Sequence, residues 1–109
     1  MLYSDQNDPV TKILLEESEN LKDVLKCVSI GEILENVAIH DVIEQGIAKL
    51  NWTMKDGSTI SNEPGVKLVN RVFGLDRNLF NEFHDEDREY AYQEFWAYLA
   101  FAIESFTQK

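Results

Sequence analysis

The sequence is poor in cysteine, because Cys27 is the only one among 109 residues. A single cysteine excludes a disulfide within the chain and any metal site built from several cysteines. Cys27 lies in an apolar stretch with helical spacing, and free cysteine is among the most buried residue types. A nucleophilic role would need an activating histidine, and no local pattern ties His40 or His84 to Cys27. We therefore interpret Cys27 as a small core residue, in a protein that works in a reducing compartment.

Long apolar runs are also missing. The longest nearly uninterrupted run, from Phe95 to Ile103, has nine residues, whereas a membrane-spanning helix needs roughly 20. The first residues have no basic start followed by an apolar stretch, so they do not resemble a secretory signal peptide. The sequence therefore predicts a cytoplasmic protein without a membrane partner.

Positive charge is scarce. Ten lysines and arginines stand against twenty aspartates and glutamates, which gives a formal net charge of −10. This charge repels nucleic acid and anionic membranes at distances that salt does not screen. The same charge favours solubility and fast encounter with a basic partner. We therefore expect a protein partner of opposite charge and no direct binding of nucleic acid.

Signatures of catalysis and of bound ions are absent as well. The chain contains no phosphate-binding glycine loop, nucleophile elbow or paired-histidine metal helix. His40 with Glu44 and His84 with Arg88 are spaced to share a helix face, but neither pair is a catalytic signature. The acidic segment 82–89 lacks the alternating ligands and central glycine of a calcium loop. The sequence predicts no enzyme activity, no cofactor and no metal site.

Apolar residues, in contrast, are plentiful enough for one core. They make up 44% of the chain and include twelve aromatic residues, and a chain of this size can bury roughly 60–70% of its surface. We therefore expect one helical domain over residues 1–109, with an irregular lead-in over 1–8. The predicted class is mainly α, with about five helices packed around the aromatic C-terminal helix.

Helical spacing of apolar residues carries this prediction. Ser29 and Glu32 form a capping-box pattern at one expected helix start. The first predicted helix covers residues 9–28, a second begins at Ser29, and a third runs from Asp41 to Leu50. Three more are predicted over 63–74, 76–83 and 85–106. The helix that begins at Ser29 and the helix over 41–50 are either one bent helix or two separate helices. The segment 52–60 is either a short hairpin around Asp56-Gly57 or a loop.

The predicted last helix holds seven of the twelve aromatic residues. One face is expected to point inward; it consists of Tyr92, Phe95, Trp96, Leu99, Ile103 and Phe106. Tyr90, Tyr98 and Phe101 lie toward the other side, so the apolar surface is wider than an ordinary core stripe. A helix of this kind is either central to its domain or shared with another chain.

The start of the same helix is the densest acidic patch. Glu16, Glu17, Glu19 and Asp23 form a second cluster, but lysines interrupt it, which is typical of a mixed solvent face. We predict a small acidic binding protein that inhibits or neutralises a basic partner such as a nuclease toxin, of the immunity-protein, antitoxin or phage-inhibitor type. The alternative is a homodimer or adaptor that uses the aromatic helix. The predicted partner-binding residues are Glu82, Asp85, Glu86, Asp87, Glu89, Tyr90 and Tyr98.

Overall fold

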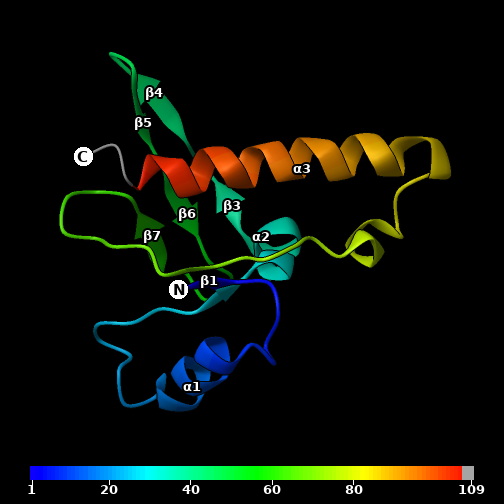
Figure 1. Cartoon of the computed structure of the whole chain (residues 1–109). Helices are drawn as coiled ribbons and strands as arrows, with labels where there is room; N and C mark the ends of the chain where they lie inside the picture. Colours follow the sequence, from blue (N-terminus) through cyan, green and yellow to red (C-terminus); the bar gives the residue numbers. More distant parts are fainter. Residues whose placement is uncertain (107–109) are drawn as a thin grey trace.

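The computed structural model describes residues 1–106, which form a mixed α/β fold (Figure 1). The helices in this part of the chain are α1 (Pro9–Glu17), α2 (Ile30–Asn36), a 3-10 helix η1 (Arg77–Phe80) and α3 (Asp85–Ser105). The strands are β1 (Leu2–Tyr3), β2 (Val28–Ser29), β3 (Ala38–Ile39), β4 (Val42–Glu44), β5 (Ile47–Lys49), β6 (Asn51–Thr53), β7 (Thr59–Ser61) and β8 (Asn70–Arg71). The mainly α prediction, and with it the all-α class, is therefore wrong.

A small parallel sheet explains two of the wrongly predicted helices. Its strand order is β2-β1-β8, so the predicted lead-in contains the central strand. Leu2 pairs with Val28 on one side and with Asn70 on the other. Val28 and Asn70 belong to the predicted helices 9–28 and 63–74, and pairing with β1 requires an extended backbone at both residues. The side chain of Leu2 is 2% exposed, so this pairing also places it in the core.

The helix predicted over 9–28 is confirmed only for its first half. Asp8 caps α1 by accepting a hydrogen bond from the Thr11 amide at 3.0 Å, as expected from its position before Pro9. The helix ends at Glu17, where serine and asparagine, which are weak helix formers, follow. Ile13 is 59% exposed, so the helix gains little from packing that would extend it further.

The segment from Asp41 to Leu50 is a hairpin of β4 and β5 instead of a helix. Gln45 and Gly46 join the two strands with φ angles of 52° and 78°. Positive φ at both positions is typical of the tight turn whose twist suits a hairpin. The spacing of Val42 and Ile43 fitted a helix, but these β-branched residues also favour strands.

Two local predictions are confirmed, and one open alternative is decided. The capping box at α2 is present, since the Glu32 amide donates to Ser29 Oγ and the Ser29 amide donates to the Glu32 carboxylate. The segment 52–60 is a hairpin, in which Thr53 of β6 pairs with Thr59 of β7. The last helix runs as α3 over nearly the whole predicted range.

The core lies where α3 crosses the sheet of order β3-β6-β7 (Figure 1). Leu99 and Ala102 on α3 are fully buried, and Trp52 of β6 is 3% exposed. Trp96, which was expected to point inward, is 39% exposed. The inward face of α3 keeps the predicted Leu99 but is rotated away from Trp96, toward Ala102 and Ser105.

Candidate interaction surface

An aromatic cluster fixes the beginning of α3 on the rest of the protein. Phe80 at the end of η1 is 1% exposed. Its ring contacts those of Phe83, Tyr92 and Phe95, with centroid distances of 5.9, 5.9 and 6.0 Å. Such aromatic contacts add to the hydrophobic gain of burial. The first turns of α3, where the carboxylates are concentrated, are therefore held on a packed base.

The predicted acidic residues gather at this end of α3, which lies far from the hairpin of β6 and β7 (Figure 1). We call the acidic surface the group of exposed residues Glu82, Asp85, Glu86, Asp87, Glu89 and Tyr90. Carboxylates in the first turn of a helix are stabilised by the positive end of its dipole. The acidic surface therefore combines concentrated charge with a stable helical backbone.

Arg88 and Arg77 organise this surface and neutralise part of it. Arg88 donates to the backbone carbonyls of Phe83 and Asn81 at 3.0 and 2.9 Å, and it pairs with Asp85 at 2.9 Å. These bonds join the turn that carries Glu82 to the first turns of α3.

Arg77 pairs with Glu89 and stacks over the ring of Tyr92 at 4.0 Å. Within residues 1–106, the carboxylates of Glu82, Glu86 and Asp87 have no ion-pair partner. The negative charges of these three carboxylates are therefore not neutralised by an ion pair within residues 1–106.

The two predicted tyrosines occupy different environments. Tyr90 is 69% exposed and lies one helical turn from both Glu86 and Glu94. Tyr98 is half-buried, and its hydroxyl accepts a hydrogen bond from the Trp52 indole at 2.8 Å. The same hydroxyl donates to the carboxylate of Asp41 at 2.5 Å. The structure thus places Tyr90 in the acidic surface and Tyr98 between α3, β6 and the β3–β4 connection.

The surroundings of Tyr98 also affect its ionisation. Burial raises the pKa of Tyr98, and the carboxylate of Asp41 that accepts its hydrogen bond raises it further. The hydroxyl therefore stays protonated and keeps donating to Asp41 over the physiological range. Its contacts lie within this chain, whereas Tyr90 presents its ring to solvent.

Sequence reasoning missed two exposed groups close to the acidic surface. Glu94 is exposed and follows Tyr90 by four residues, so it extends the line of carboxylates along α3. Trp96 is 39% exposed, although its helical position suggested the core. The periodicity of α3 could have revealed Glu94, whereas the exposure of Trp96 depends on how α3 is rotated over the sheet.

The histidines and the cysteine do not form a metal-binding arrangement within residues 1–106. His40 and His84 are both exposed, and neither lines the two cavities at β7 and β5. Cys27 is half-buried, and burial raises the pKa of its thiol. Among residues 1–106, no three histidine, cysteine or acidic side chains gather as a metal site would require. None of the helices in this part of the chain has the length and apolar character needed to cross a membrane.

Comparisons with protein-family models, with curated proteins and with solved structures found no match for this chain.

Proposed function

We propose that this chain is a small, acidic, non-catalytic binding protein that inhibits or neutralises a basic protein. Immunity proteins, antitoxins and phage-encoded inhibitors share its size and acidity, which is a likeness of physical profile only. This proposal rests on Glu82, Glu86 and Asp87, which have no ion-pair partner within residues 1–106. Glu86 and Asp87 lie one helical turn before the exposed ring of Tyr90, and Glu82 lies in the turn that precedes α3. The corresponding target would present cationic residues, as the nucleic-acid cleft of a nuclease does.

The carboxylates would act first, during encounter. A chain with a formal charge of −10 attracts a cationic surface, and local charge clusters orient the approach within about 8 Å at physiological salt. Glu82, Glu86 and Asp87 contribute most to this orientation, because Asp85 and Glu89 are already paired with Arg88 and Arg77.

Tyr90 would act next, as the anchor that keeps the complex together. Tyrosine and tryptophan are favoured anchors, because they bury large rings and also offer a hydrogen bond or an amphipathic edge. Tyr90 is 69% exposed and Trp96 is 39% exposed, so both have surface left to bury. The contacts of Phe80 hold α3 in place before binding, which reduces the conformational entropy lost on association.

The test compares two triple variants with equal loss of charge. One carries Glu82→Gln, Glu86→Gln and Asp87→Asn in the acidic surface. The control carries Glu16→Gln, Glu17→Gln and Glu19→Gln on and after α1. These substitutions also remove three negative charges from exposed positions. Tagged wild type and both variants are used to capture proteins from the source cell, and the captured protein is purified for stopped-flow association measurements. Circular dichroism confirms that all three proteins are folded.

We expect a basic captured protein whose association is slowed about fivefold or more by the acidic-surface variant, but less than twofold by the control. Tyr90→Ala should instead speed dissociation. Equal effects of both triple variants would show that only the net charge of the chain matters, and not the acidic surface. This result would contradict the proposal. Recovery of this chain alone, with a stable dimer in sedimentation, would also overturn it in favour of self-association.

A further inference from the structure

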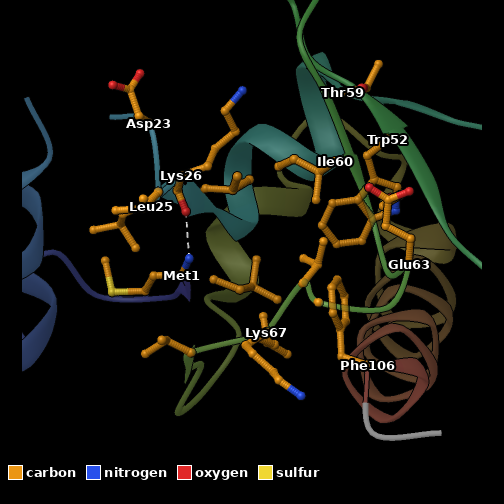
Figure 2. A pocket seen from close by; sticks show the side chains of 18 of the residues that line it. Met1, Asp23, Leu25, Lys26, Trp52, Thr59, Ile60, Glu63, Lys67 and Phe106 are labelled. Carbon is orange, nitrogen blue, oxygen red and sulfur yellow. Dashed lines mark hydrogen bonds between the residues drawn. The ribbon is translucent and has the colours of Figure 1, made fainter. Parts of the chain in front are cut away.

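A cavity of about 720 Å³ lies near the C-terminal end of α3, away from the acidic surface. Figure 2 shows it between the segment that carries Asp23 and Lys26, strand β7 with Thr59 and Ile60, and the segment of Glu63 and Lys67. Its volume lies within the roughly 300–1,000 Å³ of typical small-molecule sites. The cavity is therefore large enough for a small organic ligand.

The wall of this cavity is mixed, with apolar and polar surface in similar amounts. Leu2, Val28 and Trp52 form part of its wall and are themselves almost fully buried. Val24 and Val69 also line it but remain 84% and 40% exposed. Exposed apolar surface that continues into a buried apolar wall favours an apolar ligand, because covering it removes this surface from water.

The balance of charged residues in the cavity is opposite to that of the whole chain. Three lysines, Lys22, Lys26 and Lys67, line it together with two acids, Asp23 and Glu63. Carboxylates outnumber cations twenty to ten in the sequence, so this cavity has the opposite local balance. A ligand with a single negative charge is the best complement to that balance.

Two of the lysines lie at the rim of the cavity. In Figure 2, Lys26 and Lys67 stand on opposite sides, and their ammonium groups lie at the periphery. A lysine places its four-carbon stem along apolar surface while its ammonium group stays in water. The cavity therefore combines an apolar part of its wall with flexible cations at its rim.

We propose that this cavity binds an alkyl carboxylate, with the apolar chain against Val24, Leu25 and Val69 and the carboxylate near Lys26 or Lys67. The binding is non-covalent and involves no chemical step. It does not depend on the proposed function, because the cavity and the acidic surface lie toward opposite ends of a helix of 21 residues. Failure of one proposal therefore leaves the other in place.

The test uses sodium octanoate as the probe, followed by two-dimensional amide NMR of the full chain. Two matched probes accompany it: 1-octanol, which keeps the tail without the charge, and sodium acetate, which keeps the charge without the tail. We expect octanoate to cause saturable shifts at residues of the segments 22–28 and 63–69. Octanol should bind about fivefold or more weakly, and acetate should cause no saturable shift there.

Three variants locate the site. Lys26→Gln combined with Lys67→Gln should weaken octanoate binding about fivefold or more, and Val24→Glu should abolish it by adding a carboxylate to the apolar wall. The control is Lys12→Gln combined with Lys55→Gln, two exposed lysines outside the cavity. It should leave the affinity unchanged. Thermal unfolding confirms that each variant is folded.

Several results would overturn this proposal. They are an absence of saturable shifts, shifts centred elsewhere, or equal binding of octanol and octanoate that the lysine variants do not change. Cavity shifts that follow protein concentration without any probe would show a second copy as the occupant and would overturn it too. Loss of octanoate binding in the control variant would show that binding depends on the overall charge of the chain and not on the lysines of the cavity. This result would also overturn the proposal.

Discussion

Asp8 and Arg71 form a two-bond ion pair that joins the start of α1 to the parallel sheet. Arg71 donates from Nε to Oδ2 of Asp8 at 3.0 Å and from Nη2 to Oδ1 at 2.9 Å. The same carboxylate accepts from the amide and hydroxyl of Thr11 at the first turn of α1. Because α1 is otherwise largely exposed, this pair is a main link between the helix and β8.

The ion pair predicts a pH-dependent stability. The hydrogen bonds from Arg71 lower the pKa of Asp8 from an ordinary value of 3.8 to about 2, and those from Thr11 act in the same direction. A carboxyl with a lower pKa in the folded state stabilises that state above the unfolded pKa, and the effect disappears as the pH falls to the folded pKa. Asp8→Asn should therefore lower the free energy of unfolding at pH 7, and its difference from wild type should shrink between about pH 4 and about pH 2.

Urea unfolding at a series of pH values measures this difference. Asparagine still caps a helix, so the variant removes the charge and the ion pair while keeping the cap. Asp23→Asn serves as the control, since it removes an exposed carboxylate that forms no ion pair within residues 1–106. A difference between Asp8→Asn and wild type that stays constant from pH 7 to about pH 2 would refute the role of this pair.

The hydroxyl of Tyr98 should matter for stability more than that of Tyr90. Tyr98→Phe removes the acceptor for the indole N–H of Trp52, a residue that is 3% exposed. Leaving a buried donor unpaired costs about 1–3 kcal/mol, so the free energy of unfolding should fall by that amount. Tyr90→Phe changes a residue that is 69% exposed and should stay within about 0.5 kcal/mol of wild type. Urea unfolding followed by tryptophan fluorescence distinguishes the two, and equal effects would contradict the buried network.

Asn62 should be another sensitive position, because its buried side chain bonds three backbone groups. It accepts from the Leu50 amide at 2.9 Å and donates to the carbonyls of Ala48 and Ser105 at 2.9 and 3.2 Å. Asn62→Ala should lower the free energy of unfolding by about 2 kcal/mol or more. Hydrogen exchange of the Leu50 amide should accelerate. Asn20→Ala, at an exposed turn, is the control, and unchanged exchange at Leu50 would show that the amide is protected without Asn62.

The turn of the β4–β5 hairpin offers a pair of opposite predictions. Gln45 has a φ of 52° and Gly46 a φ of 78°. Asparagine tolerates positive φ better than glutamine does, so Gln45→Asn should raise the free energy of unfolding by about 0.5 kcal/mol. Gly46→Ala should lower it by about 1–2 kcal/mol, since a Cβ is disfavoured there. Midpoints of urea unfolding measure both, and a stabilising Gly46→Ala would contradict the turn geometry.

Local signals predicted several elements of this fold correctly. The Ser29 and Glu32 capping box, the Asp8-Pro9 helix start and the Asp56-Gly57 turn each depend on interactions within a few residues. The long helix α3 has many apolar residues spread around its surface, and its acidic first turn matches the helix dipole. For the candidate site, the sequence therefore predicted which carboxylates stand together.

Other segments were ambiguous because their pattern fits two structures. Val42, Ile43 and Ile47 have helical spacing, yet the positive φ of Gln45 and Gly46 makes a hairpin of the same residues. The exposure of Tyr90 and the internal bonds of Tyr98 also differ, although both tyrosines lie on one helix. Which side of α3 faces the core depends on the strands beneath it, and these come from distant parts of the chain.

The sequence by itself determined the charge of the protein, the position of α3 and the gathering of carboxylates at its beginning, because composition and short-range contacts suffice for these. Only the tertiary structure decided that Leu2 pairs with both Val28 and Asn70, and that a lysine-lined cavity lies near the other end of α3. Strand pairing joins residues far apart in the chain, and its hydrogen bonds and burial outweigh the weak helical preference of each segment.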